Sequence, residues 1–425
     1  MAAALPREIR RHRLGNGLDV VLHPDRALPL VAVNLWYHVG SKNERPGRTG
    51  FAHLFEHMLF QGSAHVGTND HFRHLQRIGG VANGSTWYDR TNYYETVPAQ
   101  ELDLALWLES DRMGHLLPGL DQGKLDNQRE VVMNERRQRV DNQPYGRPYE
   151  RLFELLVPPD HPYHWPVIGT MADIASATLD DVRSFFRTWY VPNNAVLTLA
   201  GDFDPDDALA RVERWFGDVP PGPTPERRSF ALPPLEQPIA ETVADHVQLP
   251  RIYLAFRTEP FGRREWFAAS LLSTLLSTGK SSPLYHDLVY DRQLAQDVAA
   301  YVYPTEEIGV FLVIATAKPG IEAERLAGAL RTHLDRAATS PPAPSEWERA
   351  RNATLAGIFG QLETLDHRAD QLSMYATYFD RPELAWGEAE RYLELGPDEL
   401  CAFAGARLAA ERAVELTVLP ERSGA

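Results

Sequence analysis

A proline-rich stretch near the middle of the chain most constrains what the sequence can fold into. Seven prolines fall between Val219 and Pro238. Proline fixes φ and removes a backbone donor, so this stretch can continue neither a helix nor a central strand, and it reads as a linker. Because 425 residues are too many for one ordinary hydrophobic core, the sequence predicts a domain over residues 1–218, a linker over 219–238 and a second domain over 239–425.

The order of predicted elements repeats after this linker. In the first half we expect strands at 18–22, 31–37, 81–88, 92–97 and 195–200, and helices at 49–62, 68–78, 101–116, 125–140 and 180–190. The second half restarts with a strand at 251–256, helices at 265–277 and 283–290, and strands at 298–303 and 309–317. The pattern predicts an α+β fold of two homologous domains, each a mixed or antiparallel sheet with helices packed on one face.

The composition excludes several classes of protein. A formal net charge of −15 argues against binding to nucleic acid or to anionic membranes. Cys401 is the only cysteine, so neither a disulfide framework nor a cysteine zinc site is available. No apolar run is long enough to span a bilayer. Residues 1–13 are polar and arginine-rich without an apolar core, so they do not resemble a secretory signal and we expect a cytoplasmic protein.

Three residues of the first half form a candidate metal motif. The run between Thr49 and Gly62 reads as one helix, with the threonine able to cap its start and the glycine its end. His53 and His57 are four residues apart and therefore share a face, with Glu56 beside them. Two neutral imidazoles suit zinc, and the carboxylate can take a proton from a metal-bound water. This is the H-x-x-E-H arrangement; the alternative is that one or both histidines are hydrogen-bonded core residues.

A protein zinc site needs a third ligand, and Glu135 is the candidate. Leu125, Gln128, Val132 and Glu135 share one face of the predicted helix at 125–140. Glu130 lies about 140° away around the helix and should face elsewhere. The periodicity favours Glu135 as a buried carboxylate, whereas spacing alone leaves open a solvated, charged helix surface.

Together these motifs resemble the pitrilysin/insulinase family of zinc peptidases, the inverzincins. Glu135 follows His57 by 78 residues in a V-V-x-x-E context. Further stretches agree with the family: Gly79–Asn83, Thr91–Tyr94, His161–Tyr163, Ile168–Gly169, Tyr190–Asn194 and Gly201–Asp202. The closest subgroup is that of short bacterial proteases related to the β subunit of the mitochondrial processing peptidase. The resemblance implies a LuxS/metallopeptidase-like duplicated fold.

The resemblance also implies roles for the motif residues. His53, His57 and Glu135 would bind one Zn²⁺ per chain, and Glu56 would be the general base that activates water against a peptide carbonyl. The implied activity is that of a zinc-dependent metalloendopeptidase on peptides or unfolded segments. The helix of the second copy at 265–277 contains no histidine, so only the first half can hold a metal in this way.

Two further positions follow from the same resemblance. Asn83 matches the family's asparagine on the active-site edge strand, where a peptide substrate is expected to pair as an added strand; a plain turn residue after Gly79-Gly80 is an equal alternative. Gln128 stands where the family often has a second glutamate behind the ligands. We expect it to tune zinc affinity rather than to abolish binding.

One departure from the family predicts a partner. Active relatives often carry an arginine and a tyrosine, seven residues apart in the second domain, that contact substrate near the zinc. Val289 and Gln296 occupy these two positions, and valine cannot donate a hydrogen bond to a carbonyl oxygen. We therefore expect a heterodimer with a homologous chain that supplies the Arg/Tyr clamp, and we favour it over a homodimer.

The competing interpretation is a non-catalytic structural subunit, as the core subunits of a respiratory complex are in this family. Such chains typically lose the metal motif, whereas all four motif residues are present here. Because function belongs to the site rather than to the fold, the peptidase is favoured. The sequence does not separate a general peptidase from one that processes a single precursor.

Overall fold

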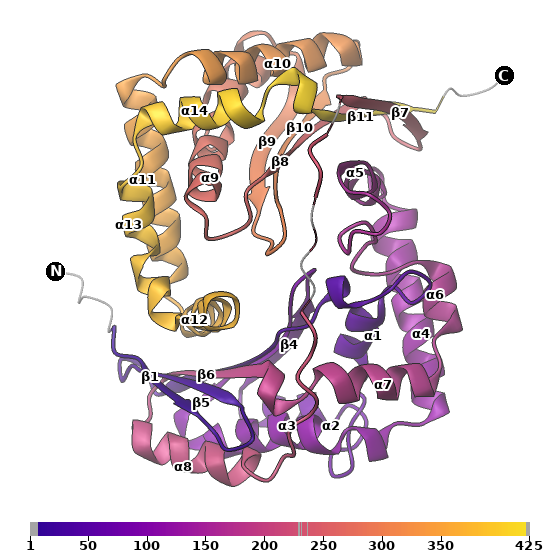
Figure 1. Cartoon of the computed structure of the whole chain (residues 1–425), viewed down its shortest axis with the longest axis vertical. Coiled ribbons are helices and arrows are strands. Elements are labelled where there is room, and N and C mark those ends of the chain that lie inside the picture. Colours follow the sequence, from indigo (N-terminus) through magenta and orange to yellow (C-terminus); the bar gives the residue numbers. More distant parts are fainter. Residues whose placement is uncertain (1–6, 228–229, 231, 236, 422–425) are drawn as a thin grey trace. The chain divides into compact units, whose positions relative to one another are not determined.

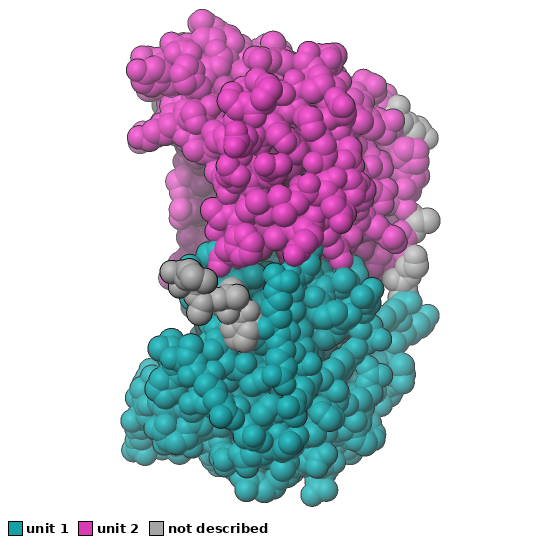
Figure 2. Space-filling view, turned by 90° about the vertical axis from the view of Figure 1, so that its left-hand side faces the viewer, with its two compact units in different colours: residues 1–136, 165–228, 360–387 teal, residues 137–164, 229–359, 388–425 magenta. Residues whose placement is uncertain are grey.

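The computed structural model describes residues 7–227, 230, 232–235 and 237–421, and the chain divides into two compact units. Unit 1 comprises residues 1–136, 165–228 and 360–387, and unit 2 comprises residues 137–164, 229–359 and 388–425 (Figures 1 and 2). None of the described helices is long and apolar enough to cross a bilayer.

Among its described residues, unit 1 contains a six-stranded mixed sheet in the order β1-β2-β6-β3-β5-β4. Its strands are β1 (Arg10–Arg13), β2 (Asp19–Pro24), β3 (Leu30–Tyr37), β4 (Val81–Thr86), β5 (Thr91–Pro98) and β6 (Ala195–Gly201). The strand β3 is interior: it pairs antiparallel with β5 and β6, and seven of its eight residues are buried. The strands β2 and β6 run parallel.

The described part of unit 2 holds a five-stranded sheet in the order β7-β11-β8-β10-β9. Its strands are β7 (Ile239–Asp245), β8 (Arg251–Thr258), β9 (Ala295–Tyr303), β10 (Gly309–Ala317) and β11 (Val414–Pro420). This sheet repeats the order β2-β6-β3-β5-β4, with β7 parallel to β11 and the other pairs antiparallel. The predicted duplicated α+β fold with mixed sheets is therefore confirmed.

Helices alternate with the strands in both halves. The first half contributes α1 (Phe51–Met58), α2 (Asp70–Arg77), α3 (Leu102–His115), α4 (Gln122–Arg136), α5 (Pro148–Leu156), α6 (Met171–Ser176), α7 (Leu179–Trp189) and α8 (Pro205–Phe216). The second half contributes α9 (Arg264–Ser277), α10 (Ala323–Thr339), α11 (Pro344–Gln361), α12 (Leu365–Phe379), α13 (Glu388–Leu393) and α14 (Pro397–Arg407). The stretches expected to be helical at 137–140 and 285–290 form π-helical turns instead, over Arg137–Asp141 and Tyr285–Asp291.

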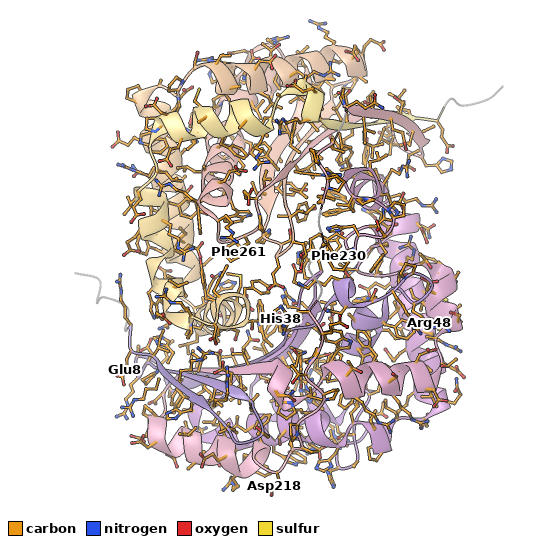
Figure 3. The ribbon with its side chains drawn as sticks, viewed as in Figure 1. Glu8, His38, Arg48, Asp218, Phe230 and Phe261 are labelled. Carbon is orange, nitrogen blue, oxygen red and sulfur yellow. The ribbon has the colours of Figure 1, made fainter. Side chains whose placement is uncertain are left out.

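The sheet of unit 1 is covered on both faces, whereas the sequence predicted helices on one. Val31, Val33 and Leu35 of β3 point into the main core with α1, α3, α7 and α8. Ala32 packs on the opposite face together with residues of α12 (Figure 1). The ring of His38, labelled in Figure 3, contacts Tyr378 of α12 with centroids 5.7 Å apart. This second face is buried and carries polar side chains, such as Asn34 and Asn92, which find hydrogen-bond partners on α12.

Each compact unit includes a helix from the other half of the sequence, so the units do not follow the predicted domain boundaries. The helix α12 comes from the second half of the sequence but belongs to unit 1, and α5 comes from the first half but belongs to unit 2, where it contacts β8 and β11. Each sheet lies within its predicted range, but the ranges 1–218 and 239–425 do not describe the compact units. The described residues of the predicted linker at 219–238 lie outside helices and strands.

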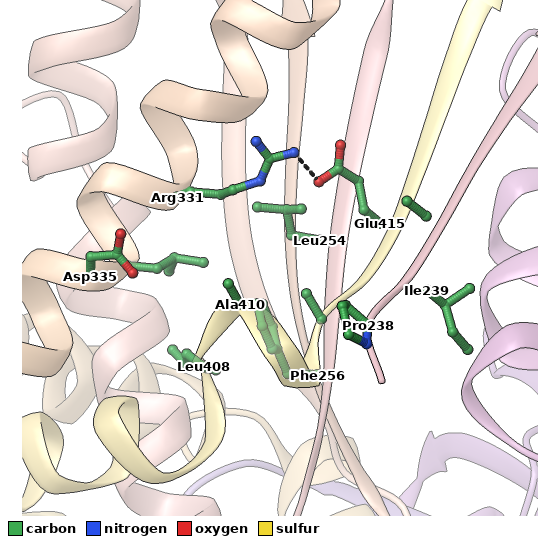
Figure 4. Close-up of a pocket in the computed structure, with 12 residues that line it drawn as sticks. Pro238, Ile239, Leu254, Phe256, Arg331, Asp335, Leu408, Ala410 and Glu415 are labelled. Carbon is green, nitrogen blue, oxygen red and sulfur yellow. Dashed lines mark hydrogen bonds and ion pairs between the residues drawn. The ribbon is translucent and has the colours of Figure 1, made fainter. Parts of the chain in front are cut away.

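Unit 2 also contains an apolar pocket of about 170 Å³ between α10 and the sheet (Figure 4). Leu254 and Phe256 form part of its floor, and Arg331 pairs with Glu415 at 2.5 Å at its edge. None of the described residues that line it is a histidine or a cysteine. The described lining of the pocket therefore offers no imidazole or thiolate ligand for a metal ion.

Candidate metal centre

The helix α1 begins one residue after Gly50, and a glutamate outside the helix caps it. The backbone N–H groups of Gly50 and Ala52 both donate to the Glu44 carboxylate at 2.8 Å. The predicted cap, Thr49, instead donates its hydroxyl to Asp173 at 2.5 Å. Gly50 has a φ of +83°, and a Cβ there would lie 2.7 Å from the carbonyl oxygen of Ile168. This left-handed conformation and close approach exclude a side chain and set the direction in which α1 starts.

The loop before α1 is tied to the neighbouring helices. Arg48, labelled in Figure 3, donates to Asp181 of α7 at 3.3 Å and to Ser176 of α6 at 3.1 Å. The helix itself is shorter than predicted, ending at Met58, although Gly62 does adopt a left-handed φ of +88°. The motif residues nevertheless all lie within α1.

His53, His57 and Glu135 come together. The two imidazole rings lie 4.8 Å apart at 78° to each other. Glu135 Oε2 lies 3.2 Å from His57 Nε2 and 3.7 Å from His53 Nε2. One donor atom from each residue falls within 4.8 Å of the others, and all three side chains are partly shielded from solvent. Two imidazole nitrogens and a carboxylate oxygen are the donor set of a catalytic zinc site with an open fourth position, so these residues fit the ion.

The helix α4 presents Glu135 to α1 as its periodicity predicts. Leu125, Gln128 and Val132 are buried on the same face, whereas Glu130 is exposed. Gln128 donates from Nε2 to Asn127 Oδ1 at 2.9 Å. Its place is thus on the inward face, two helical turns before Glu135, and its effect on zinc remains a prediction.

Glu56 is held from the edge of the sheet. The hydroxyl of Thr86 in β4 donates to Glu56 Oε2 at 2.7 Å. A Cβ on Gly84 would lie 3.2 Å from Glu56 Cγ, so a glycine gives the glutamate room. Burial raises the pKa of Glu56, while the hydrogen bond from Thr86 and the charges of His57 and Arg90 act in the opposite direction. A carboxylate with a raised pKa that is held through one oxygen is a stronger base than an ordinary glutamate and can take a proton from water.

Asn83 lies on β4, the strand at the edge of the sheet. Its side chain is exposed, and it pairs with Tyr94 of β5 on one side only. Val81 on the same strand is 68% exposed. The Asn83 Oδ1 accepts a hydrogen bond from the N–H of Gly84 at 2.9 Å. An edge strand can accept a further extended chain along its unpaired side.

The positions of the expected clamp lie in unit 2. Val289 is half-buried in the π-helical turn Tyr285–Asp291, and Gln296 is exposed on β9. The counterpart of α1 is α9, which follows β8 as α1 follows β3 and is mostly buried and apolar. The structure therefore places the metal motif and the clamp positions in different units.

Sequence reasoning missed two other clusters among the described residues, His65–Asp111–His115 and His71–Glu95–Glu109. The second cluster already contains a cation, since the Arg112 guanidinium pairs with Glu109 and lies 3.6 Å from Glu95. For the His65–Asp111–His115 cluster, the sequence offered one signal, the four-residue spacing of Asp111 and His115 on α3. That His65 lies beside them is seen only in the folded structure.

Comparisons with known proteins agree with this geometry. The insulinase model, peptidase family M16, matches residues 19–156, and the model described as the peptidase M16 inactive domain matches residues 176–354. The zinc protease PqqE of Helicobacter pylori is 30% identical over 372 residues, covering 86% of this chain and 82% of that protein. The chain belongs to the insulinase family. The resemblance drawn from the motifs is thereby confirmed.

Solved structures share the whole fold. A protease from Helicobacter pylori matches with a TM-score of 0.91 and 28% identity, covering 97% of this chain and all of that one. The periplasmic protease PqqL of Escherichia coli matches with a TM-score of 0.79 and 19% identity. This chain covers 48% of PqqL, so PqqL is about twice as long.

Proposed function

We propose that this chain is a zinc-dependent metalloendopeptidase that hydrolyses peptide bonds in peptides or unfolded segments. The observation that carries the proposal is the convergence of His53, His57 and Glu135 beside Glu56. Membership of a peptidase family and the name of PqqE, a zinc protease, support it. The fold alone would not, because one fold serves many functions.

Each group of the site has a defined role in this proposal. His53, His57 and Glu135 would hold the zinc ion, which when bound supplies a Lewis acid that polarises a carbonyl and lowers the pKa of water. Glu56 accepts a proton from the attacking water and returns it to the leaving amine, and its raised pKa favours the first of these two transfers. Thr86 fixes one oxygen of this carboxylate. The substrate adds to the free edge of β4 beside Asn83.

The test compares Glu56→Gln with the wild type on an unfolded fluorogenic peptide, with zinc content measured on the same samples. We expect at least about a hundredfold loss of kcat because a general base contributes that much. The zinc content should not change. Glu130→Gln, which alters an exposed carboxylate of α4, should keep both rate and zinc. A wild type without zinc, or equal rates for Glu56→Gln and wild type, contradicts the proposal.

We further propose that a homologous chain completes the site in a heterodimer. Val289 and Gln296 lack the donors that the family resemblance implies at these positions. The length of PqqL, a single chain about twice as long that shares this fold, is consistent with paired copies. Specific activity of the purified chain should then be low and should rise when the partner is added.

Restoring the clamp provides a second test of the partner. Val289→Arg/Gln296→Tyr should raise the activity of the purified chain, because the family resemblance implies that donors at these two positions hold the substrate carbonyl. Asp291→Arg/Ala299→Tyr introduces the same residue types at exposed sites of the same elements and should not. Full activity of the wild-type chain at high dilution would refute the heterodimer.

The second candidate function is a structural subunit without catalysis. The missing clamp at Val289 and Gln296 favours it, and so does the description of the model matched by residues 176–354 as an inactive domain. The Glu56→Gln comparison separates the two functions, since a structural subunit has no cleavage to lose. The cytoplasmic location expected from residues 1–13 stays a prediction, and cell fractionation checks it.

A further inference from the structure

We propose that unit 1 carries a second metal site, formed by His65, Asp111 and His115, that takes a divalent transition-metal ion of the zinc type. The cluster shares no residue with the His53 site and has no role in the proposed hydrolysis. It would add one ion of lower affinity to the single catalytic ion expected per chain.

The three donors come from two neighbouring elements. Asp111 and His115 lie four residues apart in the last turns of α3, and residues at this spacing share a helical face. His65 comes from the connection that follows α1. One donor atom from each residue lies within 4.8 Å of the other two, and the two imidazole rings are 5.0 Å apart at 81°. Imidazole nitrogens together with a carboxylate oxygen are ligands that zinc, nickel and copper accept.

The backbone holds His65 at the end of α3. Ala64 donates its N–H to the carbonyl oxygen of His115 at 2.9 Å, and Ser63 donates to Val66 at 2.8 Å. A Cβ on Gly119 would lie 2.6 Å from the backbone of Ser63, so the two chains approach more closely than a side chain would allow. The loop is thus fixed on the helix before any ion binds, which is what a metal site needs for affinity.

The charge of Asp111 favours a cation here. Its carboxylate is 3% exposed. In the described part of the chain its contacts are the hydroxyl of Ser63, which donates to Oδ2, and His65 Nδ1, 2.5 Å from Oδ1. Neither group carries a permanent positive charge, and a buried carboxylate without one is costly. The buried cluster around Glu109 differs, because Arg112 supplies that charge.

The site is also open to solvent. His65 and His115 are both exposed, so an ion can enter and keep water on its remaining positions. The contact between His65 Nδ1 and Asp111 Oδ1 holds the His65 ring beside the other two donors. Exposure and the small number of ligands predict weaker binding than at the His53 site.

The test measures Zn²⁺ bound to the full-length chain by equilibrium dialysis. We expect two ions per wild-type chain, one for His65→Ala/His115→Ala and one for His53→Ala/His57→Ala. The matched control is His12→Ala/His246→Ala, which removes two exposed histidines elsewhere and should retain two. A His65→Ala/His115→Ala variant that binds as many ions as the wild type, or a His53→Ala/His57→Ala variant that binds none, overturns the proposal.

A spectroscopic measurement keeps the test independent of stoichiometry. In the His53→Ala/His57→Ala background, bound Cu²⁺ should show electron paramagnetic resonance couplings from two nitrogens. Adding His65→Ala/His115→Ala should remove them. Asp111→Asn, which removes the charge but can keep a hydrogen bond, should weaken Zn²⁺ binding at the second site at least tenfold. If the nitrogen couplings persist after His65→Ala/His115→Ala is added, the ion is bound elsewhere and the proposal is refuted.

Discussion

Two glutamates on α4 illustrate how one residue's place on a helix decides its chemistry. Glu130 and Glu135 belong to the same charge-rich helix, but Glu130 is exposed and Glu135 lies 3.2 Å from His57. The difference follows from the 3.6-residue period, because five positions turn the side chain by about 140°. Only Glu135 can therefore serve as a metal ligand.

Exchanging each glutamate tests this distinction. Glu135→Gln should lower zinc affinity by at least about tenfold, because a neutral amide replaces a charged ligand. Glu130→Gln should leave affinity unchanged. Competition with a chromophoric chelator measures both values, and a similar loss in the two variants would show that Glu135 is not a ligand.

Acid sensitivity at one buried histidine gives a second prediction. His71 is 3% exposed, and burial, followed by the charge of Arg112, lowers its pKa from 6.5 to about 3. The folded state favours neutral His71, so its contribution to stability is complete above the unfolded pKa of 6.5. That contribution is lost as the pH falls through the folded value of about 3.

The variant His71→Gln should flatten the loss of stability between these pH values. The unfolding free energy of the wild type should fall more steeply than that of the variant, by up to about 1.4 kcal/mol per pH unit. Denaturant titrations at a series of pH values measure both slopes. His12→Gln changes an exposed histidine and should keep the wild-type slope; equal slopes for wild type and His71→Gln would refute the assignment.

At the scale of elements, α1 depends on a cap from Glu44, which lies seven residues before the first residue of the helix, Phe51. Two backbone N–H groups at its start donate to Glu44, and the helix has no cap side chain of its own. The first N–H groups of a helix have no partner within it, so this carboxylate satisfies donors that would otherwise be buried.

Removing that cap should destabilise α1. Glu44→Ala should lower the free energy of unfolding by about 1–2 kcal/mol, the usual cost of losing a cap. Glu101→Ala is the control, because Glu101 directly precedes α3 and makes no side-chain cap bond. Its effect should stay within about 0.5 kcal/mol. Chemical denaturation measures both, and equal losses would exclude the capping role.

At the scale of the whole molecule, the two copies each depend on a helix from the other half of the sequence. The helix α12 lies against β3 and β6, and its Asp370 accepts hydrogen bonds from Trp36 at 2.9 Å and from Asn92 at 3.2 Å. Leu365 and Ala369 of the same helix cover Ala32. The first domain drawn from the sequence, residues 1–218, lacks this cover.

A fragment of residues 1–218 should therefore be unstable. It leaves one face of its sheet open to water, so it should bind a hydrophobic dye and elute as aggregates in size-exclusion chromatography. Appending residues 360–387 through a glycine-serine linker should restore cooperative unfolding, whereas the same residues in scrambled order should not. A monomeric, cooperatively folded 1–218 fragment would show that α12 is dispensable.

The sequence by itself determined the features that arise from local periodicity and composition. Four-residue spacing placed His53 and His57 on one face, helical period selected Glu135 over Glu130, and the repeated order of elements predicted two copies of one sheet. Each of these depends on residues close together in the chain, or on a pattern that recurs along it.

The tertiary structure decided the rest. It replaced Thr49 by Glu44 as the cap of α1, exchanged α5 and α12 between the two copies, and joined His65 to Asp111 and His115. These features depend on which distant segments become neighbours. Which distant segments become neighbours depends on how the whole chain buries its apolar surface. A given sheet face can be covered by any helix that the chain can bring to it, so local sequence does not decide which helix covers it.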